Sequence, residues 1–130
     1  LEEHGSIDSA IQVLTDFVSS KTKSSFCHFD YGPKNIFATD PITVFDPNPT
    51  INDGIIDLGR SVLISIADNE IFPEQFISGY FNGETYDRKV LQASIILNCC
   101  MKFPLWHKTK KFKNIQNAQS YLSQTKQLLD

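Results

Sequence analysis

The residues best suited to chemistry lie in one short run, HFDYGPKN, at positions 28–35. It contains Asp30 and Asn35, separated by a glycine and a proline that favour a turn. A carboxylate and an amide oxygen at the two ends of a turn can bind a hard cation or accept a proton. Such a pair, taken alone, is more often ordinary turn chemistry, because Asp and Asn side chains hydrogen-bond nearby backbone.

A third oxygen-bearing side chain, Asp46, should come close to this run. Residues 35–38 and 42–45 are rich in strand formers, and a Thr-Asp-Pro turn signal separates them, so they predict a β-hairpin. The second strand of a hairpin returns beside the first, which brings Asp46 back toward Asn35. Magnesium prefers such oxygens and leaves part of its shell to substrate phosphates, so we expect these two residues to hold it. Asp30 is then available as the base in phosphoryl transfer.

These elements resemble those of a known family. HFDYGPKN resembles the H-x-D-x-x-x-x-N catalytic loop of the kinase-like phosphotransferases, above all the aminoglycoside and choline kinase group. VFDP, residues 44–47, is similar to the family's metal-binding Asp segment. GIIDLGR, residues 54–60, is similar to the Asp-Leu element that follows, and the order and spacing of all three elements agree.

The resemblance implies a role for each matching residue. Asp30 falls at the catalytic base, Asn35 at one Mg²⁺ ligand, and Asp46 at the Asp that holds the metals against ATP or GTP. His28 and Asp57 match residues that support the loop structurally. The implied reaction transfers a phosphoryl group to a hydroxyl of a small molecule such as an amino sugar or a choline-like compound.

The sequence also departs from the family. Phe29 occupies a place where the family commonly has glycine, and no strands with an ATP-binding lysine precede His28. Met101 is the only methionine, so we expect residues 1–130 to be the C-terminal lobe of a larger kinase, without its N-terminal nucleotide-binding lobe. Residues 28–60 would carry the motifs, and residues 61–130 a helical substrate-binding subdomain. Alone, this lobe should bind ATP poorly, be inactive, and expose an apolar face where the missing lobe would dock.

The predicted fold class is α+β and mostly helical, the C-terminal lobe of a protein-kinase-like fold with one small hairpin. Apolar residues recur at helical spacing in five segments. The expected helices begin near Ser6, after Asp57, near Pro73 within residues 72–81, after Asp87, and near Asn114. We expect the fourth to end at about Met101, because Pro104 follows it.

Composition narrows the class of protein further. The chain has 130 residues, of which 41% are hydrophobic and 21% charged, as in a single globular domain. No apolar run is long enough to cross a bilayer, and the first ten residues lack the features of a secretory signal, so we expect a cytoplasmic protein. Three cysteines, an odd number, favour reduced thiols over a disulfide framework. A net charge of −3 argues against nucleic acid as the main partner.

Other chemistry has weaker support. Cys27 and His28 are neighbours on an extended segment and should point to opposite faces, which argues against a thiol mechanism. The three histidines show no paired spacing for zinc. Residues 102–126 contain six lysines and no acidic residue, so this stretch is a solvated surface, a nucleic-acid patch or a contact for an anionic substrate.

Two questions stay open at this point. Six acidic residues could favour a cationic acceptor or simply form a charged surface, namely Asp53, Asp68, Glu70, Glu74, Glu84 and Asp87. The alternative to an enzyme is a catalytically silent binding module that keeps the kinase-like lobe for protein contacts.

Overall fold

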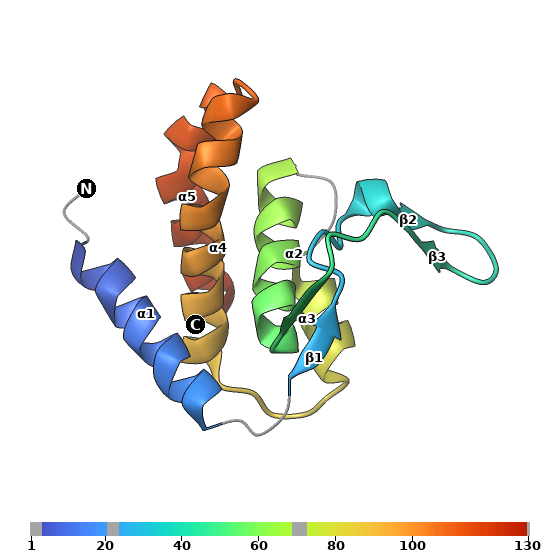
Figure 1. The fold of residues 1–130 in the computed structure, drawn as a ribbon, viewed down its shortest axis with the longest axis horizontal. Coiled ribbons are helices and arrows are strands. Elements are labelled where there is room, and N and C mark those ends of the chain that lie inside the picture. Colours follow the sequence, from blue (N-terminus) through green and yellow to red (C-terminus); the bar gives the residue numbers. More distant parts are fainter. Residues whose placement is uncertain (1–3, 21–23, 69–72, 130) are drawn as a thin grey trace.

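A computed structural model describes residues 4–20, 24–68 and 73–129, which form a helical bundle with two short antiparallel ribbons beside it (Figure 1). The helices are α1 (His4–Ser19), α2 (Gly54–Asp68), α3 (Pro73–Phe81), α4 (Arg88–Lys108) and α5 (Phe112–Leu129), with a 3₁₀ turn, η1 (Pro33–Asn35). The strands are β1 (Ser25–Cys27), β2 (Ile36–Phe37), β3 (Thr43–Val44) and β4 (Thr50–Asn52). The predicted mostly helical α+β class is confirmed.

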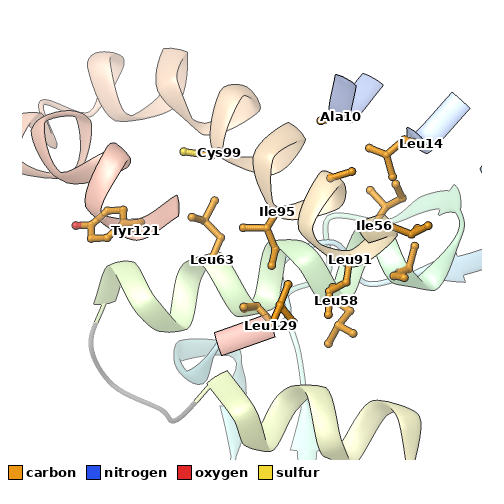
Figure 2. Packing of buried hydrophobic residues seen from close by; sticks show 14 of the residues in the cluster. Ala10, Leu14, Ile56, Leu58, Leu63, Leu91, Ile95, Cys99, Tyr121 and Leu129 are labelled. Atoms are coloured by element: carbon orange, nitrogen blue, oxygen red, sulfur yellow. The ribbon is translucent and has the colours of Figure 1, made fainter. Parts of the chain in front are cut away.

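Helix α4 forms the centre of the bundle, because α1, α2 and α5 all pack against it (Figure 1). Its Leu91 and Ile95 are fully buried, as are Val62 and Leu63 of α2. Figure 2 shows how these side chains meet others from α1 and α5 in one core. Each buried side chain of this size contributes about 1.5–3 kcal/mol relative to its exposed state. The core therefore fixes α2, which in turn carries the residues that hold the candidate site.

Polar side chains join α2 to α4 inside this core. Ser94 and Asn98, both fully buried, donate hydrogen bonds of 2.9 Å to the carbonyls of Ile55 and Ile56 respectively. Gly59 faces Ser94 directly, and a Cβ there would lie 2.8 Å from the Ser94 Cβ. The absence of a side chain at Gly59 is what lets the two helices approach so closely.

The hairpin forms where it was predicted. Strands β2 and β3 pair antiparallel, with Ile36 opposite Val44 and Phe37 opposite Thr43. They are shorter than the predicted strands, and the ribbon projects away from the bundle (Figure 1). The ribbon therefore makes few contacts with the core that could stabilise longer strands.

The second ribbon was not predicted. Strands β1 and β4 pair antiparallel, with Phe26 opposite Ile51. Each strand has three residues, and residues 28–35 and the hairpin separate them along the chain. A pairing this distant leaves no local turn signal, so only the tertiary fold reveals it.

Helix α2 begins at Gly54, earlier than the expected start after Asp57. The signal was Asp53, whose side chain accepts a hydrogen bond of 3.0 Å from the Ile55 N–H and so caps the helix.

The predicted end of the fourth helix is wrong. Helix α4 continues through Pro104 to Lys108. Proline removes one backbone hydrogen bond, but Trp106 is buried beyond it and makes an edge contact with Tyr121 of α5, at 6.4 Å between ring centroids. Packing of the last turn outweighs the local rule. The other helices agree with prediction to within a few residues, except that Phe72, inside the expected third helix, lies outside the described residues.

No helix among the described residues is both long and apolar enough to span a membrane.

The close contact between α2 and α4 generates a prediction with a matched control. Gly59→Ala should destabilise the fold by about 2–4 kcal/mol, because its Cβ meets the Ser94 side chain and lies 3.0 Å from the Ser94 carbonyl carbon. Gly79→Ala, in α3, has no atom within 4 Å of the new Cβ and should stabilise by up to about 1 kcal/mol. Urea unfolding of both variants measures the difference; equal effects would contradict the close approach.

Candidate active site

Asp57, in the first turn of α2, holds the start of the loop of residues 28–35. Its Oδ2 accepts a hydrogen bond of 3.1 Å from the His28 N–H, and its Oδ1 accepts one of 3.0 Å from the Phe29 N–H. Burial raises the pKa of Asp57, while these two N–H groups and the nearby charge of Arg60 lower it. One carboxylate thus binds two consecutive amides, which fixes the backbone that leads into Asp30.

His28 ties the same backbone to the hairpin. Its Nε2 lies 3.0 Å from the Phe45 carbonyl oxygen, and its Nδ1 accepts a hydrogen bond of 3.3 Å from the Asp30 N–H. These partners suit a neutral ring protonated at Nε2. The His28 carbonyl also accepts a hydrogen bond of 2.9 Å from the Asn48 N–H. His28 therefore links the start of the loop to the residue that follows β3.

Phe29, which departs from the family's usual glycine, adopts the left-handed backbone conformation with a φ of 57°. Glycine reaches this conformation without strain, whereas phenylalanine does so at a cost. Its ring is buried, and the Arg60 guanidinium carbon lies 4.5 Å from the ring centroid. Burial and this cation–π contact offset the backbone cost.

Asp30 and Asn35 are brought together by the turn. The Nδ2 of Asn35 donates to the Asp30 carbonyl at 2.8 Å and to the Asp30 Oδ2 at 3.1 Å. Asn35 is buried, and its Oδ1 is the atom left for another ligand. Lys34 also lies 3.4 Å from the Asp30 Oδ2, with a side chain that is 64% exposed and easily displaced.

Asp46 lies one residue beyond the bond that closes the hairpin. The Phe45 N–H donates a hydrogen bond of 3.0 Å to the Asn35 carbonyl, so the next residue is beside the loop. Asp46 is exposed and has a φ of 55°. The hairpin therefore brings the backbone of Asp46 to the end of the loop where Asn35 lies.

The oxygen atoms near the loop include ligands of the kind that magnesium prefers. Within residues 4–20, 24–68 and 73–129, no three His, Cys, Asp or Glu side chains form a group able to hold a metal ion. The amide oxygen of Asn35 and the carboxylate of Asp46 are two hard oxygen ligands, which fits a magnesium ion that keeps phosphate and water in the rest of its shell. The residues thus suit Mg²⁺ carried by a nucleotide better than Mg²⁺ alone.

Arg60 and Lys102 are buried cations near the loop, and neither was among the residues predicted for the site. Arg60 of α2 is 8% exposed and Lys102 of α4 is 9% exposed. Neither forms an ion pair with the described residues, and the Arg60 Nε has no hydrogen-bond partner there. Burial lowers the pKa of Arg60, and burial together with the charge of Arg60 lowers the pKa of Lys102 to about 8. Arg60 ends the GIIDLGR element, and Lys102 begins the lysine-rich stretch.

A cavity of about 560 Å³ lies between β1, α2 and α3. Aromatic rings form much of its wall, among them Tyr31, Phe76 and Tyr80, and Asp57 contributes a polar edge. Asp30, Asn35 and Asp46 do not line it. The cavity therefore adjoins the loop without containing the predicted catalytic residues.

Cys27 has a structural environment. Its thiol lies 3.6 Å from the Ser25 carbonyl and 3.7 Å from the Asn52 carbonyl, and burial raises its pKa. Burial also raises the pKa of Cys99 to about 12. Both thiols are held in the unreactive protonated form.

Among the acidic residues proposed as acceptor contacts, Asp53 and Asp87 cap α2 and α4. Glu70 lies outside the described residues.

No protein-family model, no curated protein and no solved structure gives a significant match to this chain. The resemblance to the kinase-like phosphotransferases thus depends on the loop and its supporting residues alone.

The Asp57 bonds generate a stability prediction. Asp57→Ala leaves the His28 and Phe29 N–H groups without their acceptor, and each unsatisfied donor costs about 1–3 kcal/mol. We expect a loss of about 2–4 kcal/mol in urea unfolding and faster hydrogen exchange at these two amides. Asp16→Ala, on the exposed side of α1, should change stability by less than about 0.5 kcal/mol. Similar losses in both variants would show that Asp57 does not hold the loop.

Lys102 generates a pH prediction. Its pKa of about 8 in the folded chain is below the ordinary 10.5, so its charge costs stability below pH 8. That cost disappears as the pH rises toward 10.5. Lys102→Met should therefore be more stable than the wild type by about 2–3 kcal/mol at pH 7, at about 1.4 kcal/mol per pKa unit. The advantage should shrink by pH 10.

The control is Lys108→Met, an exposed lysine on the same helix, whose stability difference from the wild type should stay near zero at every pH. A Lys102→Met protein no more stable than the wild type at pH 7 would mean that the ammonium group is well solvated or paired.

Proposed function

We propose that this chain is the C-terminal lobe of a kinase-like small-molecule phosphotransferase. The observation that carries the proposal is the loop held by Asp57, in which Asp30 and Asn35 are hydrogen-bonded and the hairpin returns at Asp46. An ordinary turn would explain one Asp–Asn contact. It would not need a carboxylate from another helix bound to two consecutive loop amides.

Asp30 would act on the acceptor. Its carboxylate accepts the proton of the acceptor hydroxyl as the new oxygen–phosphorus bond forms and the bond to the nucleoside diphosphate breaks. The hydrogen bond from Asn35 fixes the orientation of this carboxylate. Lys34, the exposed partner of Asp30, would have to move aside or bind the substrate instead.

Asn35 and Asp46 would hold magnesium, which neutralises charge on the phosphates when bound. The Asn35 amide is oriented by its two bonds to Asp30, so its oxygen is set before any ligand arrives. Most of the rate acceleration in such a reaction comes from position and charge. A hydrogen-bonded amide beside an exposed carboxylate would serve both needs.

The test is a magnesium-dependent phosphoryl-transfer assay on the natural protein at full length, with ATP and GTP and a panel of hydroxylated acceptors. Asp30→Asn should lower kcat by about 10²–10⁴-fold, the usual contribution of a positioned base, while the fold is kept. Asp16→Asn is the matched control and should leave kcat unchanged. Activity that survives Asp30→Asn would remove Asp30 from the mechanism.

A catalytically silent binding module is the second candidate, and the exposed apolar side chains favour it. Phe26 and Ile51 are each 78% exposed, and the hairpin exposes Phe37, Ile42 and Val44 as well. In the phosphotransferase these residues are available to an N-terminal lobe; in a binding module they are available to another protein. If nucleotide with magnesium does not shift the melting temperature and no acceptor is phosphorylated, the binding module is the better description.

A further inference from the structure

Positive charge exceeds negative charge around Asp30. Arg60 comes from α2, Lys102 from α4 and Lys34 from the loop, and the charges of Arg60, Lys34 and Asp30 all act on Lys102. Lys111, which follows α4, adds to the same field. Asp30 also acts on Arg60, together with Asp57, whose oxygens are occupied by loop amides.

Two members of this group, Arg60 and Lys102, are more than nine-tenths buried without an ion pair among the described residues. Taking an ammonium or guanidinium group out of water costs several kcal/mol unless an anion or a set of acceptors replaces the water. Arg60 has partial compensation from the Phe29 ring, but its Nε has no acceptor. An anion bound beside the candidate catalytic base would offset this cost for both cations at once.

We propose that the acceptor of the reaction carries an anionic group, a carboxylate or a phosphate, which binds between Arg60, Lys102 and Lys34 beside Asp30. This inference depends on the proposed phosphotransferase function, because it takes Asp30 as the group that faces the acceptor hydroxyl. Lys34 is the exposed member of the three and already pairs with Asp30. The bound anion would pair with Lys34 instead, which would leave the Asp30 carboxylate free to accept the proton.

The same charges argue against a cationic acceptor. An amine placed near Asp30 would meet three like charges, and like charges at close range in a partly buried site cost more than a single carboxylate returns. The acidic residues Asp53 and Asp87 are helix caps and leave this balance unchanged.

The experiment measures anion binding to the full-length natural protein by calorimetry at pH 7 and constant ionic strength. The probes are inorganic phosphate and acetate, with chloride as the background salt. Phosphate should bind, and Lys102→Met should raise the Kd for phosphate at least 10-fold. The variant should lose no stability, because methionine has a similar volume. Lys108→Met removes the same charge from the exposed surface of α4 and should leave the Kd unchanged. Binding of phosphate alone identifies a phosphorylated acceptor, and binding of acetate as well allows a carboxylate.

A second measurement separates this site from general surface attraction. The affinity that Lys102 provides should fade as the pH rises from about 8, where Lys102 loses its proton in the field of Arg60, Asp30, Lys34 and Lys111. Phosphate binding that is absent, or equal in the wild type and Lys102→Met, would overturn the proposal.

Failure of the anion site and failure of the function give different results. If the wild type phosphorylates neutral or cationic acceptors and Lys102→Met does so equally well, the function stands and the anion site is wrong. If phosphate binds through Lys102 but no acceptor is phosphorylated, the site stands as an anion-binding site and the phosphotransferase proposal fails. Asp30→Asn should then retain or strengthen phosphate binding, since it removes a competing negative charge.

Discussion

The arrangement of the site depends on the carboxylate of Asp57. It accepts hydrogen bonds from the N–H groups of His28 and Phe29 and comes from a helix that the core holds in place. Because Ser94 and Asn98 of α4 bond the first turn of α2, the carboxylate is as rigid as the centre of the bundle. A loop that would otherwise be mobile is thereby held at its N-terminal side, and the left-handed conformation of Phe29 persists despite its cost.

Electrostatics divide the loop into two sides. Toward the hairpin, Asn35 and Asp46 offer oxygen atoms to a cation. Toward the bundle, Arg60 and Lys102 offer buried positive charge. Asp30 is hydrogen-bonded to Asn35, and its charge raises the pKa of both Arg60 and Lys102 against the effect of burial. In the proposed phosphoryl transfer, this separation would keep the groups that bind a cation apart from the groups that bind an anion.

The two ribbons explain why apolar side chains remain exposed. Phe26 and Ile51 pair across β1 and β4 and are both largely exposed, and the hairpin extends away from the bundle, so no element among the described residues covers these side chains (Figure 1). Short ribbons of this kind are marginal alone. Here β1 is continued directly by the loop that Asp57 binds, which stabilises the first ribbon through the core.

The sequence by itself determined the helical periodicity, the hairpin and the order of the oxygen-bearing residues, because each depends on near neighbours in the chain. Apolar spacing, strand formers around a turn, and Asp and Asn in a Gly-Pro segment are all local signals. Only the tertiary structure decided that β1 pairs with β4, that Trp106 carries α4 past Pro104, and that Arg60 and Lys102 lie buried near Asp30. These features join segments far apart in the chain, where packing and the desolvation of charge outweigh local preference.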